Sequence, residues 1–180
     1  LMDSRRMIIT DNVFLKGEPR TKLTTEKVNA EVNAEYADCE AVITQGFVSE
    51  TEDGEPTVLG RGGSDYTASL IGMAVGATRI EIWTDVDGVK TADPRKVEGT
   101  RSLERISFEE AAEMAHFGAK VLHPMTIEPA VRKNIPIYVL NSMNPDGKGT
   151  VILQNSKIDD GVKSVSSKEN ILVINIFSTK

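Results

Sequence analysis

Residues 59–83, LGRGGSDYTASLIGMAVGATRIEIW, join a glycine-rich loop to a helix and then to a strand. After the loop, apolar side chains recur at helical spacing and form one face, which consists of Tyr66, Leu70, Met73, Ala74 and Ala77. Residues 79–83 (RIEIW) then predict a strand with isoleucine and tryptophan side chains. A loop, a helix and a strand in this order are typical of α/β proteins.

The pattern continues on both sides of this stretch. Downstream, Ser107 and Glu110 form a capping box for a helix that runs toward Gly118. The other downstream elements are a short helix over 124–133 with proline in its first turn and strands at 136–140 and 150–152. The upstream elements are a strand at 6–10, a helix over 25–39, a buried strand at 40–45 and a hairpin closed at Asp53–Gly54.

Strands that alternate with helices and are apolar on both faces predict a mostly parallel sheet covered on two sides. The expected fold class is therefore α/β, a three-layer αβα sandwich. In such sheets, ligands bind beyond the carboxyl ends of the strands, where loops and helix N-termini meet. We expect Arg61 and Asp85 to line one cleft there.

The composition excludes several classes of function. The chain has 180 residues, 39% of them apolar, with a net charge of -6 and no basic stripe, which argues against nucleic-acid binding. Its single cysteine, Cys39, excludes an internal disulfide. Without a signal peptide or an apolar run long enough to span a bilayer, the expected compartment is the cytoplasm, with no membrane partner. Both ends are interpreted as cut, so the chain is expected to be a fragment.

The glycine loop is suited to hold an anion. Three glycines, at 60, 62 and 63, let backbone N–H groups approach a ligand, and Ser64 is predicted to cap the helix that follows. Arg61 adds a guanidinium that matches a carboxylate or phosphate. Asp65 either stabilises the helix terminus or orients reacting groups. A plain turn is the alternative interpretation of the loop.

A second polar segment, 84–95, follows the strand at 79–83 directly. Its aspartates do not have EF-hand spacing, and no glutamate closes the loop. Lys90 and Arg95 are cations suited to phosphate oxygens, and a solvated turn at Asp87–Gly88 and Asp93–Pro94 is the alternative.

A third segment, 117–124, places Lys120 after a helix end, between apolar neighbours. Taken alone, this position favours a lysine that reaches out to solvent over a phosphate contact. Structural roles are expected for His116 and His123, and packing for Trp83.

Together these segments resemble the aspartate kinase family, which has the amino acid kinase fold. The matching phrases, in order, are ITQGF at 43–47, LGRGGSDYTA at 59–68, IWTDV at 82–86, TADPR at 91–95 and FGAKVLHP at 117–124. The resemblance covers nearly all of residues 1–155, which it assigns to the C-terminal part of the kinase domain. It assigns residues 156–180 to a linker and the first strand of an ACT-like regulatory domain.

The resemblance implies specific site residues. Aspartate would contact Phe47, Arg61, Gly62, Gly63 and Ser64, and the catalytic residues would be Asp65 and Lys120. ATP would lie against Thr84, Asp85, Lys90, Arg95, Lys120 and Val121. Position 90 often carries tyrosine in relatives, so Lys90 departs from the family pattern. Magnesium on the ATP phosphates is implied, without a protein ligand.

The implied activity is transfer of the γ-phosphoryl group of ATP to the side-chain carboxylate of aspartate, giving 4-phospho-L-aspartate, the first step toward lysine, threonine and methionine. A lysine or threonine effector and a homodimer are implied for the full-length enzyme, and the fragment alone is expected to be inactive. The alternatives are another enzyme of this fold, such as a glutamate or acetylglutamate kinase, and a non-catalytic chain that binds an amino acid effector.

Overall fold

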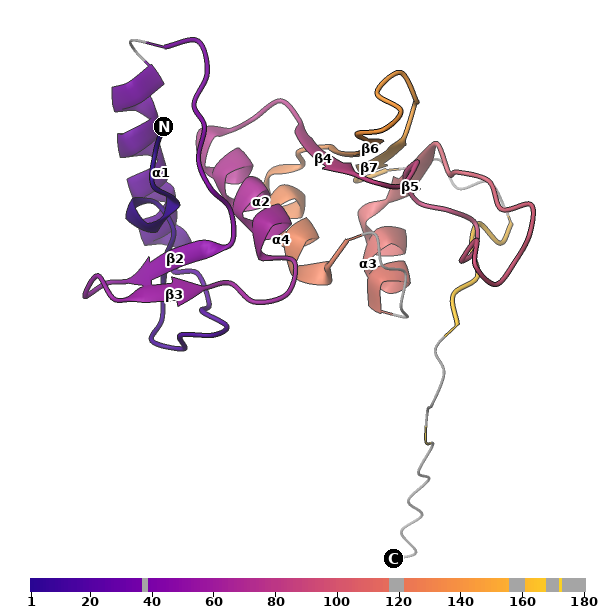
Figure 1. Cartoon of the computed structure of the whole chain (residues 1–180), viewed down its shortest axis with the longest axis horizontal. Coiled ribbons are helices and arrows are strands. Elements are labelled where there is room, and N and C mark those ends of the chain that lie inside the picture. The colour runs from indigo at the N-terminus through magenta and orange to yellow at the C-terminus, as the bar shows by residue number, and fades with distance from the viewer. Residues whose placement is uncertain (37–38, 117–121, 156–160, 168–171, 173–180) are drawn as a thin grey trace, which may run out of the picture.

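A computed structural model describes residues 1–36, 39–116, 122–155, 161–167 and 172. The helices and strands, in chain order, are η1 (Ser4–Arg6), β1 (Ile9–Thr10), α1 (Thr21–Tyr36), β2 (Val48–Thr51), β3 (Pro56–Val58), α2 (Gly63–Val75), β4 (Ile80–Thr84), β5 (Arg105–Ser107), α3 (Phe108–His116), α4 (Pro124–Lys133), β6 (Ile137–Asn141) and β7 (Thr150–Leu153). The predicted α/β class is confirmed. In Figure 1, α2 and α4 lie between a small sheet near the N-terminus and a second sheet at the other side of the molecule.

The first sheet has the strand order β1-β2-β3. β1 runs parallel to β2, and β2 pairs with β3 in an antiparallel hairpin. Gly54 takes a φ of 83° in the hairpin turn, where the Thr51 N–H donates to the Glu55 carbonyl oxygen at 2.9 Å. The hairpin predicted at Asp53–Gly54 is therefore confirmed.

The second sheet has the order β4-β6-β7-β5. β4 is parallel to β6 and β5 is parallel to β7, whereas β6 and β7 are antiparallel. The two sheets together contain five strand pairs, and three of them are parallel, as expected for a mostly parallel arrangement. The described strands nevertheless form two sheets, where the sequence pattern suggested one.

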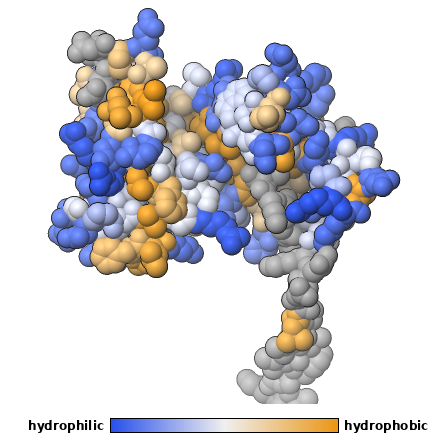
Figure 2. All heavy atoms as spheres, viewed as in Figure 1, coloured by the Kyte–Doolittle hydropathy of each residue, from blue (hydrophilic) through white to orange (hydrophobic). Residues whose placement is uncertain are grey.

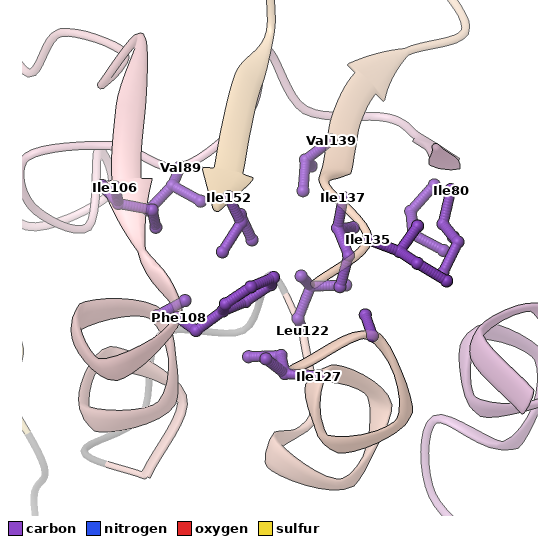
Figure 3. Packing of buried hydrophobic residues seen from close by; sticks show 13 residues of the cluster. Ile80, Val89, Ile106, Phe108, Leu122, Ile127, Ile135, Ile137, Val139 and Ile152 are labelled. Carbon is purple, nitrogen blue, oxygen red and sulfur yellow. The ribbon is translucent and has the colours of Figure 1, made fainter. Parts of the chain in front are cut away.

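The larger core lies between the second sheet and the helices α3 and α4. Figure 3 shows strand side chains, including Ile106, Ile137 and Ile152, directed toward Phe108 and Ile127 of these helices; all five are buried. Side chains alternate along a strand, so Tyr138, Val151 and Leu153 lie on the opposite face and are only partly buried. Helices of the described chain cover one face of this sheet.

The strands β4, β6 and β7 lie within one residue of their predicted bounds, whereas α1 begins at Thr21, before the predicted start at residue 25. α4 has the predicted bounds, and the capping box of α3 is confirmed: the Ser107 N–H donates to Glu110 Oε2 at 2.7 Å and the Glu110 N–H to Ser107 Oγ at 3.1 Å. The strand predicted at 40–45 is wrong, because Thr44 makes only an isolated bridge to Met2 and Ile43 is 69% exposed. The strand predicted at 6–10 shortens to Ile9–Thr10, and β5 was not predicted.

The surface mixes polar and apolar atoms (Figure 2). The loop between β1 and α1 exposes three consecutive apolar residues, Val13, Phe14 and Leu15. None of the helices in the described ranges has the length and apolar character needed to cross a membrane.

Candidate functional site

The start of α2 is an open helix N-terminus. Gly62 is its N-cap residue, with a left-handed φ of 70°, and no side chain caps the helix. The predicted cap, Ser64, is wrong: Ser64 lies inside the first turn, because the helix already begins at Gly63. Within the described chain, no acceptor pairs with the N–H groups of Ser64 and Asp65. Free N–H groups at a helix N-terminus favour an anionic ligand.

Phe47 is held against this helix start. Its N–H donates to Thr67 Oγ1 at 3.0 Å, and its carbonyl oxygen accepts from the Leu59 N–H at 3.0 Å. A Cβ on Gly63 would lie 2.7 Å from Phe47 Cδ2, so glycine is needed for this contact. Phe47 has a φ of 75°, which is unusual for a bulky residue, and its side chain is 40% exposed. The structure thus brings Phe47 against Gly63 at the start of α2, and their joint role in one substrate site stays a prediction.

Two charged side chains of this loop have no internal partner. Arg61 is exposed and makes no hydrogen bond or ion pair with a described residue. Asp65, which is partly buried, likewise accepts no hydrogen bond at its carboxylate within those ranges. Burial raises the pKa of Asp65. Unpaired charges of both signs remain available to a ligand.

The N-terminus of α4 meets the same glycine loop. A Cβ placed on Gly62 would be 2.9 Å from His123 Cβ and 3.7 Å from Thr126 Oγ1. His123 is the N-cap of α4, and its Nδ1 accepts from the Met125 N–H at 3.4 Å, which confirms the structural role predicted for this histidine. The buried Thr126 hydroxyl has no hydrogen-bond partner among the residues that the structure describes. Lys120 and Val121 lie outside the described residues; Lys120 is three positions before His123 in the chain.

Replacing Gly62 by alanine is expected to lower the free energy of unfolding by about 2–5 kcal/mol. The left-handed backbone contributes about 1–2 kcal/mol of this loss, and crowding against His123 contributes about 1–3 kcal/mol. Gly76 is the matched control, because its φ is 64° and no atom lies within 4 Å of its Cβ position. Gly76→Ala should cost only the backbone part, about 1–2 kcal/mol. Equal losses in denaturant unfolding would contradict the close contact at Gly62.

Replacing Asp65 by asparagine is expected to stabilise the protein at neutral pH. Because the pKa of Asp65 is raised by burial, the wild type loses stability as pH rises above the unfolded value, 3.8, and through the folded one. The gain of Asp65→Asn should disappear below pH 3.8, where both states are protonated. Asp93→Asn is the opposite control, because the pKa of Asp93 is lowered to about 2. The measurement is denaturant unfolding at neutral and at acid pH. A lower free energy of unfolding for Asp65→Asn at neutral pH would contradict the raised pKa of Asp65.

The predicted nucleotide residues begin at the carboxyl end of β4. Thr84 ends the strand, and its carbonyl oxygen accepts from the Ser142 N–H at 2.8 Å, which links it to the chain after β6. Thr84 Oγ1 lies 3.2 Å from Asp85 Oδ1, and Asp85 is exposed. Both residues therefore lie at the carboxyl end of a strand, where a ligand is expected in this type of sheet.

The two cations predicted for phosphate binding have partners inside their own loop. Lys90 Nζ lies 3.0 Å from Ser102 Oγ and 3.7 Å from Asp87 Oδ2. Arg95 donates to both carboxylate oxygens of Asp93, at 3.0 and 2.8 Å, and this pairing lowers the pKa of Asp93 to about 2. A phosphate would have to compete with these contacts; the Arg95 pair is exposed and therefore weak, whereas the Lys90 side chain is only 25% exposed.

The aspartate and nucleotide residues form two groups in the described structure. No hydrogen bond or ion pair between described residues joins Arg61 to Asp85, so their predicted common cleft remains a prediction. Thr67, which holds Phe47, was not among the predicted site residues. Its position four residues after Gly63 places it one helical turn away, where its hydroxyl bonds to the Gly63 carbonyl oxygen, and this spacing was a usable signal. Sequence analysis also missed a polar pocket of about 290 Å³ beside β6, lined by residues that include Asp87, Asn141 and Lys148.

Comparisons with known proteins place the chain in a family. Residues 2–141 match the model of the amino acid kinase family. Lysine-sensitive aspartokinase 3 of Escherichia coli (strain K12) is 40% identical over 176 residues, which are 98% of this chain and 39% of that protein. The chain therefore spans well under half the length of this relative.

Two crystal structures of E. coli aspartokinase III are also similar to the chain. The complex with aspartate and ADP (R-state) superposes with a TM-score of 0.83 at 44% identity, covering 87% of this chain and 35% of that one. The complex with lysine and aspartate (T-state) gives a TM-score of 0.78 with the same identity and coverage.

Proposed function

The chain belongs to the amino acid kinase family, and from this premise we propose that it forms part of an aspartate kinase. The reaction is transfer of the γ-phosphoryl group of ATP to the side-chain carboxylate of aspartate, which gives 4-phospho-L-aspartate and ADP. The similarity to a structure that contains aspartate and ADP supports the choice of both substrates. The similarity to several enzymes of that name supports the choice over a glutamate or acetylglutamate kinase.

One observation carries the proposal: at the uncapped N-terminus of α2, the N–H groups of Ser64 and Asp65 and the side chain of Arg61 have no partner among the described residues. Aspartate carries two carboxylates, and a guanidinium and a helix N-terminus are suited to bind carboxylates. Phe47, with its left-handed backbone, forms an apolar wall over Gly63. We assign aspartate binding to Phe47, Arg61, Gly62, Gly63 and Ser64.

The chemistry needs positioning and charge neutralisation rather than a general base. A carboxylate is already a nucleophile, so one of its oxygens attacks the γ-phosphorus, the bond to the β,γ-bridging oxygen breaks, and ADP leaves with the electron pair. Lys120 neutralises charge on the transferred group, and Asp65 orients the reacting groups from the first turn of α2. The lack of a hydrogen-bonded partner for Asp65 in the described structure agrees with a ligand-directed role.

ATP is assigned to Thr84, Asp85, Lys90, Arg95, Lys120 and Val121. Thr84 and Asp85 supply polar atoms at the end of β4. When ATP binds, Lys90 leaves its ion pair with Asp87, Arg95 leaves its ion pair with Asp93, and both cations contact phosphate oxygens instead. Magnesium, when bound, neutralises phosphate charge. The described residues contain no group of three metal-binding side chains, which is compatible with an ion held mainly by the nucleotide phosphates.

Regulation and assembly are further parts of the proposal. The complex of E. coli aspartokinase III with lysine favours lysine over threonine as the effector. We propose an ACT-like domain beginning in residues 156–180 and a homodimer in the full-length protein.

A coupled assay of ADP release with the full-length protein tests the function. Aspartate should support turnover, whereas glutamate and N-acetylglutamate should not. Turnover with either of the other acids and not with aspartate would assign the chain to a different enzyme of the family. Equilibrium binding of lysine without any turnover would favour the regulatory alternative.

A further inference from the structure

Residues 161–167, here called the strap, return to the loop between β4 and β5. The Val165 N–H donates to the Thr91 carbonyl oxygen at 2.9 Å, and Ser164 Oγ donates to the Lys90 carbonyl oxygen at 3.2 Å. In Figure 1, the yellow strap passes beside this loop. The contacts join segments that are more than 70 residues apart in sequence.

The strap is one of two segments that bond to the backbone of residues 90–91. The other is residues 101–102: the Thr91 N–H donates to the Arg101 carbonyl oxygen at 3.0 Å, and Lys90 forms an antiparallel bridge with Ser102. The backbone of Lys90 and Thr91 is therefore held from two directions. Removing the strap would leave it bonded from one side only.

Two further contacts anchor the ends of the strap. Lys163 Nζ lies 2.8 Å from Glu110 Oε1, and both side chains are largely shielded, at 20% and 29% exposure. Glu110 also accepts the Ser107 N–H in the capping box of α3, so this anchor is fixed to a helix end. At the other end, Lys96 Nζ donates to Ser167 Oγ at 3.1 Å. The strap thus connects the N-terminus of α3 with the loop that carries Lys90 and Arg95.

We propose that the strap positions this loop for nucleotide binding and that Ser164 and Val165 are positioning residues of the kinase reaction. The inference rests on the proposed function, because it takes Lys90 and Arg95 as nucleotide contacts. Both cations are paired with aspartates of the same loop, so phosphate binding requires a small rearrangement of their side chains on a fixed backbone. A backbone that shifts would misplace both cations together.

The effect should be specific for the nucleotide. Ser164 and Val165 make no hydrogen bond to the glycine loop within the described ranges, so aspartate binding has no direct link to them. Loss of one or two hydrogen bonds of ordinary strength corresponds to a change of about threefold to tenfold in nucleotide affinity. A general loss of folding would instead lower kcat and weaken the binding of both ATP and aspartate.

The test uses two pairs of variants in the full-length protein. Val165→Pro removes the N–H that bonds to Thr91, and Val162→Pro is its control, because Val162 is 86% exposed and its N–H has no partner among the described residues. Ser164→Ala removes the hydroxyl bond to Lys90, and Ser166→Ala is its control. ADP binding is measured by calorimetry, and the KM values for ATP and aspartate by the coupled assay.

Val165→Pro and Ser164→Ala should each raise the KM for ATP and the Kd for ADP by about threefold to tenfold, with kcat, the KM for aspartate and the melting temperature unchanged. The controls should match the wild type. ADP binding by Val165→Pro equal to that by Val162→Pro would overturn the strap's role and leave the proposed function standing. A wild-type protein that bound no ADP would overturn the proposed function, and this inference with it.

Discussion

Replacing Lys120 by alanine in the full-length protein is expected to lower kcat for aspartate phosphorylation by about 10²- to 10³-fold, the usual cost of losing one group that stabilises charge in a transition state. In the proposed reaction, charge develops on the transferred phosphoryl group and its bridging oxygen, and a cation is most effective there because water is excluded. Steady-state and single-turnover kinetics would measure the loss at the chemical step.

Lys133→Ala is the control for this variant, because Lys133 is an exposed lysine at the end of α4. It should leave kcat unchanged. The sequence offers a competing interpretation, in which Lys120 only reaches out to solvent. Unchanged turnover of Lys120→Ala would establish that interpretation and remove Lys120 from the catalytic residues.

Local signals explain which elements were predictable. α3 and α4 were predicted because their start signals are local: Ser107 and Glu110 are three residues apart, and Pro124 lies in the first turn of α4. A strand needs a neighbour that can come from anywhere in the chain. Residues 40–45 have strand-like composition, but in the described structure they pair only through Thr44. β5 was missed because it has 3 residues, Arg105–Ser107, which are too few to show a strand pattern.

The sequence indicated which residues to consider for the candidate site, but not which contacts these residues make with one another. The glycine loop indicated an anion site, and the open N-terminus of α2 agrees with it. Nothing in the sequence pattern indicated that Phe47 would have a left-handed backbone, since that conformation depends on its hydrogen bonds to Thr67 and Leu59. Nor did the pattern show that Lys90 would bond to Ser102, a contact that requires the loop to fold back on itself.

Replacing Arg61 by alanine is expected to reduce kcat/KM for aspartate by about tenfold to a hundredfold, because a hydrogen bond to a charged group contributes about 1.5–3 kcal/mol. The KM for ATP should stay near the wild-type value, because Arg61 belongs to the glycine loop and no hydrogen bond between described residues connects it to the end of β4. Arg132→Ala is the control, since Arg132 is an exposed arginine already paired with Glu128 at 2.6 Å.

The same variant distinguishes binding from folding. Arg61 has no partner among the described residues, so its removal leaves no buried group unsatisfied and should change the free energy of unfolding by less than about 0.5 kcal/mol. Arg61→Lys keeps the charge but loses the planar fork of donors, so it should recover only part of the aspartate activity. If instead only the KM for ATP rose, Arg61 would belong to the nucleotide site, and the open start of α2 would bind a phosphate rather than the carboxylate of aspartate.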